Sequence, residues 1–264
     1  MLFARVNGVV LHHRIAGAQN KPWLVLANSL GSDGRIWDGV IDRLQNRFRI
    51  LSYDKRGHGL SAAPPGPYSL ADHAADLLAL IDHLQIKRFA LAGISVGGQI
   101  AQSVAAHHGE RLSAAILCAT APRIGTPEGW NSRIEAIASG GLVALGPSLV
   151  DRWFSPSFRA KYPDRVEGYR AMIERTPVAG YVGTCATVRD ADLRGAINRI
   201  TVPTLVVSGL DDVATTPEMM SEMAHRIPYA QLEVLGPCGH IPSLEQPESL
   251  SRLIGDFLEQ VGHV

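Results

Sequence analysis

The sequence predicts an α/β protein built on a mostly parallel β-sheet with helices packed against both faces. Short runs of almost only apolar residues are typical of strands that are buried on both sides. Helical patterns lie between several of these runs, and an alternation of strands and helices indicates a parallel sheet. The apolar runs are residues 22–27, 48–53, 89–92, 114–119 and 204–208.

The other elements of this fold follow along the chain. Asn7 and Gly8 form a turn signal before a β-branched run at residues 9–15, which predicts a hairpin ahead of the parallel strands. Helices are expected where apolar residues recur at helical spacing. These patterns cover residues 69–84, 97–107 and 247–261, and a last strand is expected near residues 232–235.

The alternation stops between residues 122 and 190. This stretch holds several helical patterns interrupted by proline or glycine, and it contains no convincing strand. We interpret residues 122–190 as a helical cap inserted into a core formed by residues 1–121 and 191–264. Long insertions of this kind often form lids over a binding site. The alternative is a helical insertion without a functional role.

Composition and charge argue against several classes of protein. The 264 residues suit one large domain, or one domain with an insertion. Lys and Arg number 25, Asp and Glu also number 25, and both signs are interspersed, so no net field favours nucleic acid or an anionic membrane as a partner. The N-terminal residues contain neither the apolar core of a signal peptide nor a membrane-spanning run.

The cysteines and histidines form no pattern that would bind a metal. Cys118, Cys185 and Cys238 are odd in number and widely spaced, which matches neither a disulfide framework nor a zinc site. They suit a reducing compartment, so we expect a cytoplasmic protein. No glycine-rich phosphate loop is present either. We expect no metal and no cofactor, and the sequence is compatible with a homo-oligomer.

A Gly-x-Ser-x-Gly pentapeptide at residues 93–97 contains the best candidate for a nucleophile. It follows an apolar run directly and opens a helical pattern, an arrangement that places the serine on a sharp strand-to-helix turn with its hydroxyl group held out for attack. Gly93 and Gly97 lack the Cβ atoms that would clash where the strand and the helix meet. We therefore predict that Ser95 is a catalytic nucleophile.

A serine nucleophile needs a base and an acid that orients this base, and with such a turn they follow in the order acid, then base. The acid is expected just after the strand at residues 204–208, where Asp212 has the better spacing and Asp211 is the alternative. The base is expected to be His240, in a Gly-His pair before the last helix. All three side chains would meet at the carboxyl ends of the strands, where open α/β sheets bind ligands.

Two backbone N–H groups are expected to form the oxyanion hole. One belongs to Val96, directly after the nucleophile, and the other to Leu30, in the loop after the strand at residues 22–27. Asn28 and Ser29 in the same loop could equally be turn formers. His58 precedes the nucleophile and lies in a glycine-rich turn, so we predict that it holds a loop beside the site.

These motifs together resemble the α/β-hydrolase superfamily. The resemblance rests on four motifs that span most of the chain: the Gly-x-Ser-x-Gly pentapeptide at residues 93–97, the Asp-x-Arg-Gly-His-Gly-x-Ser string at 54–61, the Gly-x-x-Asp string at 209–212 and the Gly-His pair at 239–240. It implies the α/β-hydrolase fold, with a mostly parallel eight-stranded sheet, flanking helices and an inserted helical cap. It also implies a triad of Ser95, Asp212 and His240.

The resemblance narrows to the 3-oxoadipate enol-lactonases of aromatic catabolism. The strings that carry it are residues 26–31, 124–127, 130–131, 152–154 and 185–193. Those in the cap are the more specific, because superfamily members diverge there. Asn28 and Ser29 stand where many superfamily members have His-Gly. Ala27 and Val96 depart from the family pattern, in which Asn and Met are frequent, and this puts the fine fit of the substrate in doubt.

The resemblance implies hydrolysis of 3-oxoadipate enol-lactone to 3-oxoadipate in the β-ketoadipate pathway, through an acyl-enzyme and without a cofactor. The free carboxylate of this small-molecule lactone needs a cation. We predict that Arg133 and Trp130, one helical turn apart, bind the substrate together with Trp153. The alternative cations are Arg152 and Arg189.

Other activities remain open at this point. Carboxylesterases, C–C bond hydrolases and perhydrolases of the same superfamily would share the triad. A ligand-binding protein that retains the hydrolase shell is the non-catalytic alternative.

Overall fold

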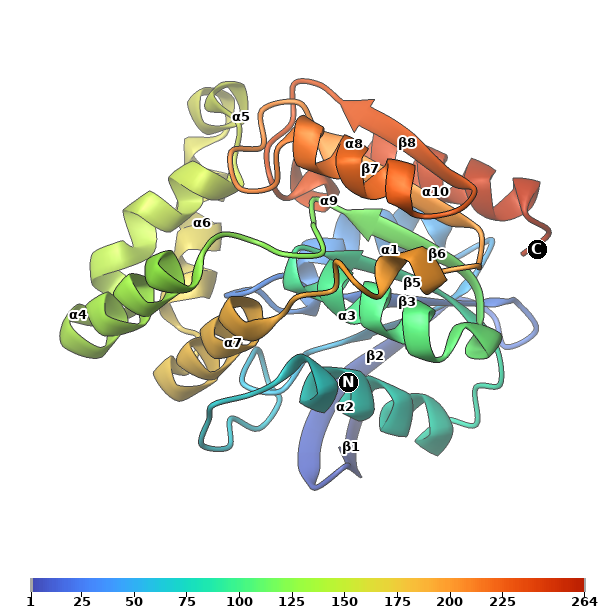
Figure 1. The fold of residues 1–264 in the computed structure, drawn as a ribbon, viewed down its shortest axis with the longest axis horizontal. Coiled ribbons are helices and arrows are strands. Elements are labelled where there is room, and N and C mark those ends of the chain that lie inside the picture. The colour runs from blue at the N-terminus through green and yellow to red at the C-terminus, as the bar shows by residue number, and fades with distance from the viewer. Residues whose placement is uncertain (1, 264) are drawn as a thin grey trace.

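The computed structural model describes residues 2–263, in which eight strands form one sheet of order β1-β2-β4-β3-β5-β6-β7-β8 (Figure 1). β1 and β2 form the predicted hairpin, β2 pairs antiparallel with β4, and all other neighbours are parallel. The strands are β1 (Leu2–Val6), β2 (Val9–Ala16), β3 (Trp23–Ala27), β4 (Arg49–Tyr53), β5 (Phe89–Ile94), β6 (Leu112–Cys118), β7 (Thr204–Gly209) and β8 (Ala230–Leu235).

The central strands are the apolar runs of the sequence. Every residue of β5 and β7 is buried, because helices cover both faces of the sheet at these strands. β8 lies at the edge of the sheet and alternates between half-buried and exposed residues along most of its length. One apolar core contains side chains of α1, α9 and α10, and a second core, on the other face, contains side chains of α2, α3 and α8.

The helices predicted from periodicity are present within one or two residues of the expected bounds. Ser69 caps its helix, since its hydroxyl accepts the N–H of Asp72 while the Asp72 carboxylate accepts the N–H of Ser69. α1, α8 and the short α9 were not predicted. The core helices are α1 (Asp38–Leu44), α2 (Leu70–His83), α3 (Val96–His107), α8 (Pro217–Arg226), α9 (Pro242–Glu245) and α10 (Pro247–Gln260), with short 3₁₀ helices η1 (Gly34–Trp37), η2 (Gly109–Arg111) and η3 (Ile197–Arg199).

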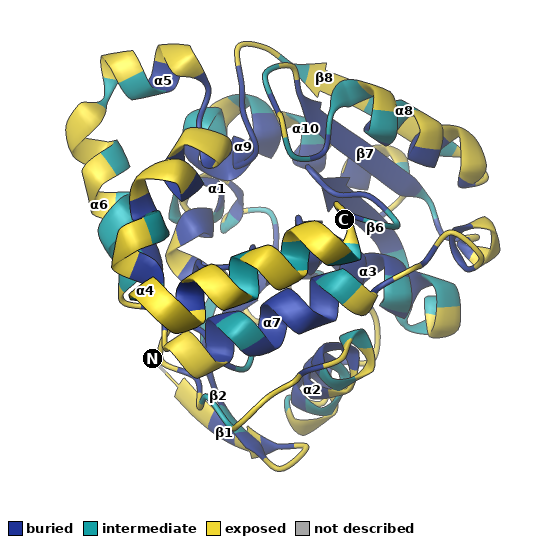
Figure 2. Cartoon of the chain, turned by 60° about the vertical axis from the view of Figure 1, so that its left-hand side comes forward, coloured by how far each residue is buried: buried dark blue, intermediate teal, exposed yellow. Residues whose placement is uncertain are grey.

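Four helices fill the chain between β6 and η3 and lie together at one side of the sheet (Figure 1). They are α4 (Pro127–Trp153), α5 (Pro156–Lys161), α6 (Pro163–Glu174) and α7 (Val178–Asp190). α4 packs against α6 and α7. Figure 2 shows α4 as a mostly exposed outer helix, whereas α7 is largely buried beneath it. We call these four helices the cap helices.

One helix among residues 2–263, α4, is long and apolar enough by length and composition to cross a membrane. Its backbone is broken at Gly141, where φ is 69° and ψ is −179°. A membrane span needs about 20 consecutive helical residues, and neither part of α4 reaches this length. We therefore describe α4 as a bent helix of the cap.

Candidate active site

Ser95 occupies the turn between β5 and α3, where the sequence places a nucleophile. Its φ of 58° lies in the left-handed region, which is strained for a residue with a side chain. The two glycines allow this turn, because a Cβ atom on Gly93 would lie 2.1 Å from the carbonyl oxygen of Gly97, and one on Gly97 would lie 2.4 Å from that of Ala27. The turn thus requires glycine on both sides of Ser95.

Asp212 and His240 form a buried pair. The His240 Nδ1 atom lies 2.8 Å from the Asp212 Oδ2 atom, and the two residues are 5% and 3% exposed. The Asp212 carboxylate also accepts the N–H of Ala214 at 2.8 Å and the hydroxyl of Thr215 at 2.7 Å. Burial alone would raise the pKa of Asp212, but the His240 charge and these hydrogen bonds outweigh it and lower the pKa. Asp212 therefore stays ionised at neutral pH and can orient the imidazole.

Asp211 precedes Asp212 in the chain, but it is hydrogen-bonded to the loop that carries His240 and not to His240 itself. Its Oδ2 atom accepts the N–H of Cys238 at 3.1 Å, and its own N–H donates to the Cys238 carbonyl at 2.8 Å. Of the two adjacent acids, it is Asp212 that contacts His240.

Ser95 and His240 line a common cavity of about 280 Å³ beneath the cap helices. In the described structure no hydrogen bond joins the side chains of Ser95 and His240. Hydrogen bonds of this catalytic kind often form only once substrate is bound. The core side of the cavity includes Ser29 and Leu30 from the loop after β3. The cap side of the cavity consists of Ile124, Gly125, Thr126, Gly129, Trp130, Arg133, Leu149, Arg152, Trp153, Tyr181 and Val188.

Neither predicted oxyanion donor has an acceptor for its N–H group in the described residues. Val96 is the first residue of α3, so its N–H has no partner within the helix. The N–H of Leu30 has no acceptor in the described part of the chain. Leu30 is 6% exposed and lines the cavity. The arrangement can therefore offer two backbone donors to an oxyanion that forms on the Ser95 side of the cavity.

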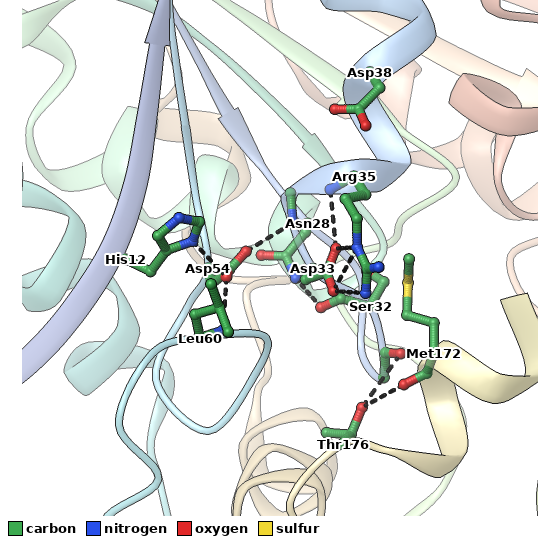
Figure 3. Close-up of polar contacts among 12 residues, drawn as sticks. His12, Asn28, Ser32, Asp33, Arg35, Asp38, Asp54, Leu60, Met172 and Thr176 are labelled. Carbon is green, nitrogen blue, oxygen red and sulfur yellow. Dashed lines mark hydrogen bonds and ion pairs between the residues drawn. The ribbon is translucent and has the colours of Figure 1, made fainter. Parts of the chain in front are cut away.

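The loop that carries Leu30 is held by side-chain contacts on both sides. The Asn28 amide donates to the Ser32 carbonyl, so this residue stabilises the turn (Figure 3). The Asp54 carboxylate accepts the N–H of Gly34 at 2.8 Å and is paired with His12 Nδ1 at 2.8 Å. The hydroxyl of Thr176, at the start of the α6–α7 connection, approaches the Gly31 carbonyl at 3.5 Å. These contacts fix the loop independently of any ligand.

His58 is not among the residues that line this cavity. Its Nε2 atom accepts the N–H of Gly31 at 2.9 Å. Burial, followed by the charge of Lys55, holds the pKa of His58 well below its usual value, so the imidazole is neutral and can accept this bond. This is the loop-holding position expected for His58.

The structure brings the predicted substrate-binding residues Trp130, Arg133 and Trp153 to the cavity wall. The Arg133 guanidinium lies 4.6 Å from the centre of the Trp130 ring. Arg152 lies on the same wall. Neither Arg133 nor Arg152 has a carboxylate within 4 Å in residues 2–263. Burial, and then the charge of Arg133, lowers the pKa of Arg152, so the two cations act on each other and leave a positive field in the cavity.

Arg189 does not line this cavity. Its guanidinium forms bonds of 2.8 Å to the adjacent Asp190 and a bond of 3.1 Å to Asn131. The alternative that names Arg189 as the substrate cation is therefore not supported by its position.

Tyr181 is a wall residue that sequence reasoning did not identify. It lies on α7, is 2% exposed, and its pKa is raised by burial. The Gly-Tyr-Val-Gly string around it interrupts a helical pattern and gave the one available signal. The apolar wall residue Leu149 carried no signal at all, because it looks like an ordinary core position.

Comparisons with known proteins agree with this arrangement. Residues 22–247 match the α/β hydrolase fold family. The 3-oxoadipate enol-lactonase 2 of Acinetobacter baylyi is 34% identical to this chain over 246 residues, which cover 93% of this chain and 92% of that protein. The crystal structure of the enol-lactonase from Burkholderia xenovorans LB400 superposes with a TM-score of 0.96 at 38% identity, covering 98% of this chain and 100% of that one.

A thermophilic esterase from Thermogutta terrifontis, solved with malate bound, has a similar fold. It superposes with a TM-score of 0.93 at 28% identity and covers 100% of this chain and 99% of that one. The predicted eight-stranded α/β-hydrolase fold is thus confirmed, and so is the resemblance to enol-lactonases. The chain belongs to the α/β-hydrolase family and is a hydrolase similar to the 3-oxoadipate enol-lactonases.

Proposed function

We propose that this protein hydrolyses 3-oxoadipate enol-lactone to 3-oxoadipate, as a step of aromatic catabolism. The observation that carries the proposal is a cavity that combines Ser95 and His240 with two arginines lacking a carboxylate partner, Arg133 and Arg152. An anionic lactone would find both a nucleophile and a counter-charge there. Direct measurement of lactone hydrolysis by its ultraviolet absorbance tests this proposal.

In the proposed reaction, His240 takes the proton of the Ser95 hydroxyl as Oγ attacks the lactone carbonyl carbon. Asp212 holds the imidazole in the required tautomer and stabilises its charge. The N–H groups of Leu30 and Val96 bind the oxyanion, and one such donor contributes about 3–4 kcal/mol to lowering the barrier. The role of these groups is largest in the tetrahedral intermediate, where the negative charge develops.

Collapse of the intermediate breaks the ring C–O bond and gives an acyl-enzyme. The leaving group is an enolate, which is a better leaving group than a simple alkoxide, and it accepts the proton from His240. Because the substrate is a ring, this group stays attached to the acyl chain on Ser95. Water, activated by His240, then releases the product, whose enol becomes the 3-oxo acid. No step needs a cofactor.

We propose that residues 122–190 form a cap that determines the substrate, with Arg133 as its carboxylate-binding residue and with Trp130 and Trp153 as an apolar wall. Residues 122–190 supply most of the cavity lining. The core supplies the reacting groups. The three cysteines are free and buried, which supports a reducing compartment such as the cytoplasm.

Alanine in place of Arg133 is expected to raise KM for the lactone about tenfold and to leave kcat nearly unchanged. A hydrogen bond to a charged group contributes about 1.5–3 kcal/mol, and the half-buried position of Arg133 places the effect near the lower bound. Because the carboxylate is bound equally in the ground state and in the transition state, the loss is confined to KM.

Arg189→Ala is the matched control, since it removes the same side chain outside the cavity, and its KM should equal that of the wild type. The KM of Arg133→Ala for a neutral aryl ester should also stay the same. An unchanged KM for the lactone in Arg133→Ala would exclude Arg133 as the carboxylate-binding residue.

A carboxylesterase is the second candidate function. It is supported by the 28% identity to the Thermogutta terrifontis esterase over the whole of this chain. Both functions would use Ser95, Asp212 and His240 in the same way. They differ in whether the enzyme prefers an anionic lactone or a neutral ester, so the ratio of kcat/KM for these two substrates separates them.

A further inference from the structure

Lys55 is a fully buried lysine that the proposed mechanism does not use. It follows β4, is 1% exposed, and has no carboxylate within 4 Å in the described residues. Its Nζ atom donates a hydrogen bond to the carbonyl oxygen of Ser29. Lysine is almost never fully buried without a partner, because removing its charge or its amine from water is costly. Such a residue therefore calls for a physical reason.

The position of Lys55 follows from the register of the sheet. β3 and β4 are parallel neighbours, and Ala27 at the end of β3 lies opposite Tyr53 at the end of β4. The residues just beyond these ends must therefore lie side by side. This brings Lys55, two residues past Tyr53, to Ser29, two residues past Ala27.

The acceptor of this hydrogen bond belongs to the proposed oxyanion hole. The carbonyl of Ser29 and the N–H of Leu30 are the two ends of one peptide unit, which is trans like all described peptide bonds except the two that precede Pro67 and Pro237. In a planar trans peptide, the C=O and N–H groups point in opposite directions. Lys55 thus holds the carbonyl end of the peptide unit whose N–H belongs to Leu30, a cavity-lining residue whose N–H has no acceptor in the described residues.

The peptide unit that supplies the other proposed oxyanion donor, the N–H of Val96, is also held at its carbonyl end. The carbonyl of Ser95 shares a peptide unit with the N–H of Val96, and it accepts the Thr120 hydroxyl at 2.7 Å. Thr120 Oγ1 in turn accepts the Gln102 amide at 3.2 Å. Both donor peptides therefore receive side-chain hydrogen bonds at their carbonyl ends: the Ser95 carbonyl from the Thr120 hydroxyl, and the Ser29 carbonyl from the Lys55 amine and from the Ser32 hydroxyl at 2.9 Å.

We propose that Lys55 is a positioning residue that orients and polarises the Ser29–Leu30 peptide, so that its N–H binds the oxyanion more strongly. A hydrogen bond to a carbonyl draws electron density toward the oxygen and makes the N–H of that amide a better donor. The bond also fixes the peptide plane before substrate arrives, so that no reorganisation is needed as the charge develops. This inference rests on the proposed function only in that Ser95 attacks a carbonyl carbon.

The charges around Lys55 bear on the strength of this effect. Burial lowers the pKa of Lys55 well below its usual value, while the charges of Asp54 and Asp33 act against this. An amine donates a hydrogen bond in either protonation state. Orientation of the peptide is therefore retained in both states, and polarisation is greater when Lys55 is protonated.

Lys55→Met tests the proposal, because methionine has a similar length and apolar stem but no donor. Removal of a whole oxyanion donor costs about 10²–10³-fold in kcat. Since Lys55→Met leaves the Leu30 N–H in place, we expect a smaller fall, of about 10- to 100-fold, in both kcat and kcat/KM for 4-nitrophenyl acetate. KM should be unchanged, because the ground-state carbonyl carries little charge.

The second readout is the inhibition constant of phenylboronic acid, which forms a tetrahedral adduct with a catalytic serine. In Lys55→Met this inhibition constant should rise by the same factor by which kcat/KM falls. The inhibition constant of adipate, which forms no such adduct, should not change. A merely structural role of Lys55 would not separate the two inhibitors in this way.

Tyr53→Phe is the matched control. It also deletes a buried polar atom from the end of β4, but its hydroxyl group has no hydrogen-bond partner in the described residues, and its side chain belongs to the core that contains α2, α3 and α8. Its kcat and both inhibition constants should equal those of the wild type. If Lys55→Met does not fold, as judged by circular dichroism, Lys55→Leu takes its place with the same expected pattern.

A Lys55→Met or Lys55→Leu protein with wild-type kcat and wild-type boronate affinity would overturn the proposal. This outcome is distinct from failure of the proposed function. If the wild type hydrolyses the ester but not the lactone, the substrate is wrong while the Lys55 test still applies. If the wild type hydrolyses neither and is not labelled by a fluorophosphonate, serine hydrolysis itself is wrong.

Discussion

Replacing Ser95 with alanine is expected to lower kcat for the enol-lactone by about 10⁶-fold. The substitution removes the nucleophile but leaves the cavity, the Asp212–His240 pair and both oxyanion donors in place, so that binding and a small residual rate remain. Steady-state rates measure the loss, and labelling by a fluorophosphonate, read by intact mass, identifies the site. The wild type should gain one label, and Ser95→Ala should gain none.

Ser113→Ala is a suitable control for this experiment. It removes a serine hydroxyl from β6 that has no hydrogen-bond partner in the described structure. Both its rate and its labelling should match those of the wild type. Labelling of Ser95→Ala at the wild-type level would show that another residue is the nucleophile.

Replacing Asp212 with asparagine is expected to lower kcat by about 10⁴-fold with little effect on KM. The N–H groups of Ala214 and Thr215 would keep the asparagine oxygen at the Oδ1 position, so its NH₂ group would replace Oδ2 and donate to His240 Nδ1. The imidazole would then adopt the wrong tautomer and could not take the Ser95 proton. The pKa of Asp212 is lowered in the folded protein. The activity that depends on its carboxylate is thus present at neutral pH and is lost only as the pH falls through this lowered pKa.

Asp211→Asn provides a close comparison, because it makes the same chemical change one residue earlier. This residue contacts Cys238 rather than His240, so kcat should fall by less than about tenfold, far less than in Asp212→Asn. Equal losses of kcat in the two variants would contradict the assignment of Asp212 as the acid of the triad.

The core of the site was predictable because local rules determine it. Gly93 and Gly97 are required by the turn itself, and the parallel strands bring every loop after a strand to the same edge of the sheet. Order and spacing along the chain therefore made His240 and Leu30 candidates and left Asp211 as an alternative to Asp212, and the structure shows that Asp212 contacts His240. The contact between Lys55 and Ser29 needed the register of β3 and β4, which the sequence does not specify.

The sequence indicated that residues 122–190 are helical, but it did not indicate how these helices pack. Its helices pack through contacts between distant segments, so periodicity did not show that Tyr181 would face the cavity. Nor did it show that Arg189 would instead pair with its neighbour Asp190. The break in α4 depends on the positive φ of Gly141. A glycine allows a positive φ but does not require it, so the break could not be predicted. In the core, α1 was missed because a helix of 7 residues is too short for a clear period.

The most direct test of the account is the initial rate of loss of ultraviolet absorbance of 3-oxoadipate enol-lactone, compared with the rate for 4-nitrophenyl acetate. We predict rapid hydrolysis of the lactone by the wild type, with a much higher kcat/KM than for the ester, and a kcat for Ser95→Ala that is lower by about 10⁶-fold. Slow turnover of the lactone beside fast cleavage of the ester would contradict the account and identify an esterase.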